Sequence, residues 1–474
     1  MLININNDFA LGDFILNGIK SNAHNFSEFI ESGVDVRTGS FSINFKAVKF
    51  LTNRGSGPNL DISLSYSFLN KVDTGFGHGW SFPVSRFNKD NNQLYLSSGQ
   101  NFKIEWNRSK NEYDIPYRKL KDIRVLYDDS KQSLVVVHKD GSREIINYET
   151  GLLDELISTK GAKVTFSYAI PGFGNEPILW KIEDEYGDRV EFDWWTDITH
   201  RHSIITHFVD NEEANKIDFY IERIGLFNLI TYVNTFDDLS CGIQYTIVSD
   251  TMVGEYALIS QVEHATGLIE NINYNAHGYR LPSGAPYTYL PCVIEHRIEF
   301  GANQDPKITE YSYDAKNYLG YLSGVEWRPD RDTLFYADQN YQYSVTEKCI
   351  SNLRTVTHTF NKYHLRQSVD YLYNGQRYQF DQMEYFAELD RSIDEQPENY
   401  ALLKSKTNTY YNSAGQSKDY TVEYDFDEYG NEIFVKQHDG SQVIREFYPL
   451  EGAAGSCPRA LLRNSIELNQ ELTI

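Results

Sequence analysis

The stretch TVEYDFDEYGNEIFVKQHDGSQVIREFY, residues 421–448, decides the fold. Apolar and polar residues alternate over 421–427, the period of two that places one set of side chains on each face of a β-strand. EYGN at 428–431 then predicts a tight reversal, because glycine accepts the positive φ that such a turn needs. A second short strand, an Asp-Gly turn at 439–440 and a third strand follow. The stretch therefore predicts a β-meander.

The same layout, a tyrosine-containing strand followed by a glycine turn, recurs along the chain. Its signature residues are Tyr186, Gly187, Tyr274, Gly278, Tyr313, Asp314, Tyr424, Asp425, Gly430 and Gly440. Their irregular spacing argues against a propeller or a tight solenoid. No segment shows helical periodicity for more than two turns, so the prediction is an all-β fold built as a long antiparallel β-strip of meandering hairpins.

Composition limits the possible functions. The 474 residues are 41% hydrophobic and 14% aromatic, which allows large cores and favours strands. The formal net charge of −23 repels phosphate backbones, so nucleic-acid binding is not expected. The four cysteines form no CxxC pair and are interpreted as ordinary thiols, although one disulfide is not excluded. Length alone predicts about three domains unless one repetitive sheet runs through the whole chain.

The N-terminus, MLININNDFALGDFILNGIK, has neither a basic leader nor a sustained apolar run. No later window approaches the roughly 18 consecutive apolar residues of a membrane-spanning helix. We therefore expect no membrane span and synthesis in the cytoplasm without a classical signal peptide. Any export would use a specialised machine.

A glycine-rich stretch, DTGFGHGWS at 73–81, has the GxGxG spacing of a phosphate-binding loop. It leads into Phe82-Pro83 and not into a helix, so the dinucleotide-binding interpretation lacks its required context. The preferred interpretation is an open backbone corner that lets Phe76 and Trp80 pack into a sheet. No cofactor is predicted.

Two clusters of polar residues were weighed as catalytic or metal sites. A metal site is geometrically possible for His200, His202 and His207 with Asp193 and Asp197, but a polar strand face or loop is the preferred interpretation, because loosely spaced His/Asp clusters are common false positives. Glycosidases need facing carboxylates across a sugar, whereas Glu183, Asp184, Glu185 and Asp188 are better explained by a solvated turn. No GxSxG, HExxH or P-loop motif is present. We assign no catalytic residue and no metal, and predict that the chain is not an enzyme.

Three tryptophans offer an alternative function. Trp194, Trp195 and Trp327, together with the many tyrosines, could stack a carbohydrate ligand, because sugars present apolar faces to aromatic rings. Aromatic residues in β-sheets are more often cross-strand packing pairs, so core packing is the default interpretation.

The chain resembles the N-terminal shell region of RHS-repeat, or YD-repeat, toxin proteins. The resemblance covers nearly everything from Ser21 to Cys457, with many segments in the same order. The segments are SNAHNFSEFIESGVDVRTGSFSINF (21–45), ISLSYSFLNKVDTGFGHGWSFPVSRF (62–87), LYLSSGQNFKI (94–104), EYSYDAKNYLGYLSGVEW (310–327), HTFNKYHL (358–365) and YDFDEYGNEIFVKQHDGSQVIREFYPLEGAAGSCP (424–458).

The resemblance implies a β-strip that curls into part of a hollow shell around a toxic polypeptide. It implies bacterial origin, an enclosed or downstream-encoded toxin as partner, and delivery by an injection system or as a toxin-complex component. The expected parts are a lead-in segment at 1–30, a first part of the shell at 31–300 and its YD-repeat continuation at 301–474. The family's later self-cleaving core and toxin have no counterpart in these segments, so neither activity is carried over to any residue.

The resulting prediction is a non-enzymatic shell segment of an RHS-type toxin. The alternatives are a β-module that binds carbohydrate or a cell surface, and a hydrolase with an unidentified site. An acidic wall would stay soluble and could hold a basic polypeptide by weak, screened attraction.

Overall fold

The computed structural model describes residues 30–116, 118–174, 176–235, 239–301, 304–328, 332–447 and 462–468. Over these ranges the chain is all β apart from three short 3-10 helices, η2 (Asn53–Gly55), η3 (Thr333–Tyr336) and η4 (Ile393–Glu395). Within the described part, no helix has the length and apolar character needed to cross a membrane. The lead-in segment expected at 1–30 lies outside the described residues except for Ile30.

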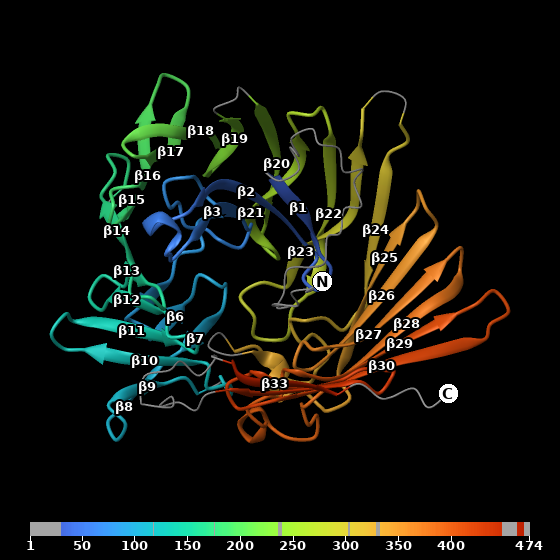
Figure 1. Cartoon of the computed structure of the whole chain (residues 1–474). Coiled ribbons are helices and arrows are strands. Elements are labelled where there is room, and N and C mark those ends of the chain that lie inside the picture. Colours follow the sequence, from blue (N-terminus) through green and yellow to red (C-terminus); the bar gives the residue numbers. More distant parts are fainter. Residues whose placement is uncertain are drawn as a thin grey trace.

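Most strands form one antiparallel strip, and each strand from β8 to β33 pairs with its neighbour in the chain (Figure 1). Its strands are β8 (Glu105–Asn107), β9 (Glu112–Asp114), β10 (Ile123–Asp128), β11 (Ser133–His138), β12 (Arg143–Asn147), β13 (Leu153–Ile157), β14 (Lys163–Ala169), β15 (Ile178–Asp184), β16 (Arg189–Thr196), β17 (Arg201–Val209), β18 (Glu212–Ile224), β19 (Phe227–Thr235), β20 (Ser240–Asp250), β21 (Gly254–Glu263), β22 (Ile269–Arg280), β23 (Tyr289–Glu299), β24 (Lys307–Tyr313), β25 (Gln342–Cys349), β26 (Arg354–Asn361), β27 (Arg366–Tyr373), β28 (Gln376–Tyr385), β29 (Leu403–Tyr411), β30 (Ser417–Phe426), β31 (Glu432–Lys436), β32 (Gln442–Phe447) and β33 (Leu462–Leu468). The predicted all-β strip of meandering hairpins is confirmed, and β30, β31 and β32 are the meander predicted for 421–448.

The residues before the strip build two smaller sheets. One has the order β1 (Ile30–Asp35), β2 (Ser40–Phe50), β3 (Leu60–Tyr66) and β4 (Trp80–Ser81), and the other consists of β5 (Arg86–Asn88), β6 (Gln93–Tyr95) and β7 (Asn101–Lys103). The strip itself begins only at β8. Strands β23 and β24, on either side of the division expected at residue 300, are paired with each other. That division stays a prediction.

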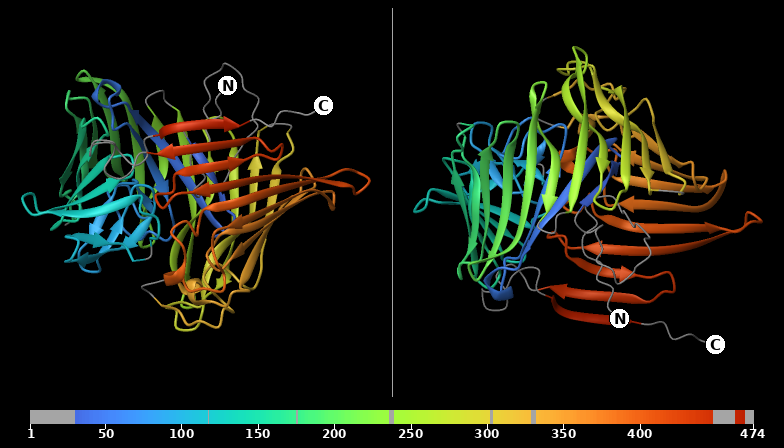
Figure 2. Two further views of the ribbon diagram at one scale, coloured as in Figure 1. Left: turned by 60° about the horizontal axis from the view of Figure 1, so that its bottom comes forward. Right: turned by 90° about the horizontal axis from the view of Figure 1, so that it is seen from above.

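The strip curves around the sheet β1–β4, which lies between its middle and its last strands (Figure 2). Aromatic side chains fill the contact. Phe45 on β2 packs against Trp80 on β4 with ring centroids 5.4 Å apart, and against Phe219 on β18 at 6.1 Å. All three side chains are fully buried. Burying one large apolar side chain contributes about 1.5–3 kcal/mol, so this interface fixes the sheet within the curve.

The glycine-rich stretch at 73–81 is the backbone corner that the sequence predicts. Phe76 and Trp80 are both fully buried. His78 lies against β19, where its backbone N–H donates to the carbonyl oxygen of Asn228 at 2.7 Å. Glycine is required at 77 because φ is +84° and an added Cβ would stand 2.6 Å from that same carbonyl oxygen.

Three of the four signature glycines lie in turns as predicted. Gly187, Gly430 and Gly440 have φ of +89°, +71° and +85°. Gly278 is a correction, because it lies inside β22, next to the register shift between Asn275 and Tyr279, and not in a turn. A Cβ there would stand 2.3 Å from Cys292 Sγ on β23, so close packing across the bulge, and not a reversal, explains this glycine.

We expect Gly77→Ala to lower the free energy of unfolding by at least about 2 kcal/mol, because the new Cβ adds a clash with Asn228 to the cost of a positive φ. Gly99→Ala is the matched control: its φ is +81° but nothing lies within 4 Å of an added Cβ. Urea unfolding of both variants separates the clash from the backbone strain. Equal losses would show that the close approach at Gly77 has no cost.

Candidate functional site

A row of rings crosses four neighbouring strands on the convex face of the strip. Its members, which lie opposite one another in register, are Trp195 on β16, His202 on β17, Tyr220 on β18 and Tyr232 on β19. Trp195 and His202 stack with centroids 3.8 Å and planes 6° apart, and His202 meets Tyr220 edge-on at 4.5 Å. Because residues opposed on paired strands share a face, the register itself builds this row.

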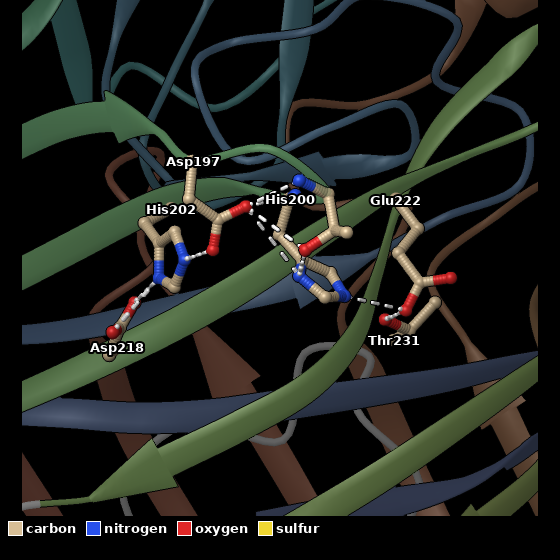
Figure 3. Close-up of polar contacts among 7 residues, drawn as sticks. Asp197, His200, His202, Asp218, Glu222 and Thr231 are labelled. Carbon is tan, nitrogen blue, oxygen red and sulfur yellow. Dashed lines mark hydrogen bonds and ion pairs between the residues drawn. The ribbon is translucent and has the colours of Figure 1, made fainter.

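His202 is held between two carboxylates (Figure 3). Its Nδ1 lies 3.1 Å from both carboxylate oxygens of Asp218, and its Nε2 lies 3.2 Å from Asp197 Oδ2. The backbone N–H groups of His200 and Thr199 donate to Asp197 Oδ1 and hold the pKa of Asp197 below its usual range. Both ring nitrogens of His202 therefore lie within hydrogen-bond distance of a carboxylate oxygen.

His200 takes part in a hydroxyl–imidazole–carboxylate chain (Figure 3). Its Nε2 lies 3.2 Å from Glu222 Oε1, to which Thr231 Oγ1 also donates at 2.9 Å, and its Nδ1 lies 2.7 Å from Thr199 Oγ1. Such a chain resembles a nucleophilic triad in composition. Thr199 is exposed and Glu222 is half-buried, however, and the Thr199 hydroxyl also lies 3.0 Å from Asp197 Oδ1. The arrangement is that of a hydrogen-bonded turn.

The metal site considered for the histidine cluster is not assembled. His207 faces the core against Phe50, with centroids 5.5 Å apart, and burial lowers the pKa of His207. Positions 202 and 207 differ by an odd number, so on one strand they point to opposite faces. Asp193 makes no hydrogen bond with the histidines. In the described part of the chain, no three His, Cys, Asp or Glu side chains are placed to hold a metal ion.

The acidic stretch at 183–188 holds the turn between β15 and β16. Glu183 pairs with Lys181 at 2.8 Å, whereas Asp184 is buried and accepts hydrogen bonds from the backbone N–H groups of Asn53, Tyr186 and Asp188. These carboxylates therefore point in different directions. They fasten the turn to the N-terminal sheet and do not face each other across a cleft.

The three tryptophans considered for ligand stacking do not share a surface. Trp195 is 48% exposed on the convex face. Trp194 packs against the core, and its Nε1 is buried without a hydrogen-bond partner. Trp327 lies between β24 and β25, where its backbone N–H donates to Ser283 at 2.9 Å. Adjacent residues on a strand point to opposite faces, which separates Trp194 from Trp195.

Sequence reasoning missed two buried polar centres. Asp73 accepts hydrogen bonds from the glycine-rich corner and from Arg201 on β17, and Glu270 joins β1 to β22 and β23. For Asp73 the available signal was an acidic residue two positions before the GxGxG stretch. The second had none, because its partners are distant in sequence. Cys241, Cys292 and Cys349 are free thiols, and Cys457 lies outside the described residues.

No protein-family model matches the chain, and no curated protein matches its sequence. The crystal structure of TcdB2-TccC3 without its hypervariable C-terminal region is similar at a TM-score of 0.33 with 10% identity, covering 91% of this chain and 25% of that one. The crystal structure of TcdB2-TccC3 gives 0.22 with 9% identity, covering 86% and 25%. The N-terminal domain of effector protein SpvB from Salmonella typhimurium strain LT2 gives 0.14 with 10% identity, covering 90% and 100%. The chain thus spans a quarter of the first two structures. Scores of this size do not establish a common fold, so function has to be inferred from the residues of this chain.

Proposed function

We propose that the chain is a non-enzymatic shell segment of an RHS-type bacterial toxin, which encloses or carries a toxic polypeptide for delivery. The observation that carries this proposal is the uninterrupted pairing from β8 to β33, which makes the strip a curved wall. The segments between residues 21 and 458 that resemble RHS proteins supply the family. The expected partners are an enclosed or downstream-encoded toxin and an injection or toxin-complex component. The expected route is synthesis in the bacterial cytoplasm followed by specialised export.

The concave face differs along the strip. Around β17–β24 it is apolar and is covered by β1–β4. Beyond β25 the same face becomes more polar. Residues paired on neighbouring strands share a face, and the residues opposite one another on this face from β25 to β29 are Val345, His358, Val369, Asp381 and Asn408. Cargo would therefore meet the wall along β26–β30. A polypeptide held there would contact amide, carboxylate and tyrosine side chains instead of a hydrophobic core.

We expect the polypeptide encoded immediately downstream to co-elute with this chain, and its toxin portion to resist protease only in this chain's presence. Asn408→Arg, on the concave face, should weaken the association by about tenfold by placing a cation against a basic cargo. Thr409→Arg is the matched control, because the adjacent residue points to the convex face.

Two results would refute the shell function. One is a chain that remains alone on co-purification, and the other is a cargo that stays protease-sensitive in the complex. Equal effects of the two arginine substitutions would reject the concave face as the contact while leaving the shell function in place. A glycan-binding screen would then test the carbohydrate alternative.

A further inference from the structure

The strip meets itself near its two ends (Figure 1). The segment 118–122, between β9 and β10, lies against the turn 427–431, between β30 and β31. Across this contact the backbone N–H of Lys121 donates to the carbonyl oxygen of Glu428 at 2.9 Å. The side chains of these two residues, which are 307 positions apart in sequence, form an ion pair. The contact therefore closes the strip into a ring through loops.

The turn between β30 and β31 keeps its shape through contacts of its own. Asp427 Oδ1 accepts the backbone N–H groups of Tyr429 and Asn431, both at 2.9 Å. Asp427 Oδ2 accepts from the side-chain Nδ2 of Asn431 at 2.9 Å. An aspartate that bonds to the backbone two and four residues ahead fixes a reversal locally. The turn is therefore preformed before anything docks on it.

The segment 118–122 is likewise held from its own side. Arg118 Nε lies 2.8 Å from Asp122 Oδ1, and the side chains of this ion pair are only 11% and 19% exposed. The Arg118 guanidinium also lies over the ring of Phe102 on β7, 4.7 Å from its centroid. Because each side keeps its shape through its own contacts, the two can separate as preformed units.

Two further lysines and a leucine cross the contact from the side of the first strands. Lys119 Nζ donates to the carbonyl oxygen of Asp394 in η4 at 2.8 Å. Lys139 Nζ, in the turn between β11 and β12, donates to the carbonyl oxygen of Gly430 at 3.3 Å. Leu120 packs on Gly430, where an added Cβ would stand 3.4 Å from both Leu120 Cδ atoms. Basic side chains that face oxygen atoms therefore make much of this contact.

The ion pair in this contact is partly exposed. The side chains of Lys121 and Glu428 are 51% and 43% exposed. Exposed ion pairs contribute little to stability and weaken as salt is added. Neighbouring strands are joined more firmly, since the β10–β11 ladder pairs all six residues of β10. Between these two kinds of junction, the contact between the loops opens more readily.

We propose that the segment 118–122 is a clasp, which closes the ring when it docks on the β30–β31 turn and opens the ring when it is released. The closed and open states differ in charged contacts, so a change of charge shifts the balance between them. Opening moves the last strands away from the first ones and uncovers the concave face of β26–β30, and every ladder stays paired. The inference concerns the strip alone and does not depend on the shell function proposed above.

The first test uses the full chain and hydrogen exchange at the amide of Lys121, followed by mass spectrometry. Glu428→Lys should speed this exchange about tenfold, because the substitution replaces an attraction by a repulsion but leaves the carbonyl acceptor in place. The charge swap Glu428→Lys/Lys121→Glu should restore protection, relative to the intrinsic exchange rates. Glu310→Lys is the matched control, because its exposed partner Lys348 lies on β25, which a ladder joins to β24. It should leave the exchange unchanged.

Small-angle X-ray scattering distinguishes opening of the ring from loosening of one hydrogen bond. The variant Lys119→Glu/Lys121→Glu/Lys139→Glu reverses all three lysines of the clasp and should have a larger radius of gyration than the wild type, with circular dichroism showing intact strands. If this variant is unfolded, the exchange experiment decides alone. The proposal is overturned by unchanged exchange in Glu428→Lys, by a charge swap that restores nothing, by an equal effect of Glu310→Lys, or by an unchanged radius in the folded triple variant.

Discussion

Replacing Asp73 by alanine is expected to lower the free energy of unfolding by about 3–5 kcal/mol, the cost of removing one partner from a buried ion pair. Asp73 Oδ1 accepts the backbone N–H groups of Gly75 at 3.0 Å and Gly77 at 2.9 Å. Arg201 Nη2 lies 3.0 Å from Oδ1 and 2.8 Å from Oδ2, and Asn228 Nδ2 lies 3.3 Å from Oδ2. The side chains of Asp73 and Arg201 are 17% and 11% exposed, so the substitution leaves the guanidinium in a largely dry site. Urea or thermal unfolding measures the loss.

Two further variants separate charge from geometry at this site. Asp73→Asn retains an acceptor for the glycine N–H groups but loses the charge, and should lose less stability than Asp73→Ala. The double variant Asp73→Ala/Arg201→Met should lose less than the sum of the two single changes, because no isolated cation remains. Additive losses, or a change below about 1 kcal/mol for Asp73→Ala, would contradict the central role of this carboxylate.

Local sequence patterns predict the strip well because its pairing is local. Each strand pairs with its chain neighbour, so alternation and turn residues suffice for the meander at β30–β32 and for the turns at Gly187, Gly430 and Gly440. The corner at 73–81 was predictable for a related reason. Its glycines lead into Phe82-Pro83, a context that suits a bend and not a helix.

The N-terminal sheet could not be predicted from these patterns. Residues 60–66 alternate as the strands of the strip do. Nothing in that alternation shows that β3 belongs to the separate sheet inside the curve and is not one of the strands of the strip. The contacts that decide this are long-range, such as Phe45 against Phe219. The metal site considered for the histidine cluster was wrong because alternate residues of a strand point to opposite faces. Proximity in sequence suggested one site, but His202 and His207 point to opposite faces.

The contact of the N-terminal sheet with β22 and β23 centres on Glu270, which is 3% exposed. Its Oε1 accepts a hydrogen bond from Ser32 Oγ on β1 at 2.5 Å and lies 2.6 Å from His264 Nε2. Its Oε2 lies 2.6 Å from Nε2 of His296, whose ring meets Phe41 edge-on at 5.5 Å. Burial of Glu270 raises its pKa, but the hydrogen bonds from the two histidines and Ser32 outweigh burial, so that the pKa lies below its usual range.

Glu270 also acts on a neighbouring thiol. Burial, with the charges of Glu270 and Glu263 as further causes, raises the pKa of Cys241 to about 12. The thiol therefore stays neutral at ordinary pH.

Replacing Glu270 by glutamine is expected to lower the free energy of unfolding by about 3 kcal/mol at pH 7, because one amide cannot accept from two histidines and a serine as a carboxylate does.

The loss of unfolding free energy in Glu270→Gln should depend on pH in a definite direction. The pKa of Glu270 is lower in the folded than in the unfolded state, where it is about 4.3, so near pH 4 the unfolded state binds more protons. The stabilisation is complete above the unfolded pKa and is lost as pH falls through the folded one. The gap in unfolding free energy between wild type and Glu270→Gln should therefore narrow from pH 6 towards pH 3, in denaturant titrations at several pH values. Glu105→Gln, at an exposed position on β8, should show no such trend. A gap that is constant or widens on acidification would mean that Glu270 is not the ionised centre of this contact.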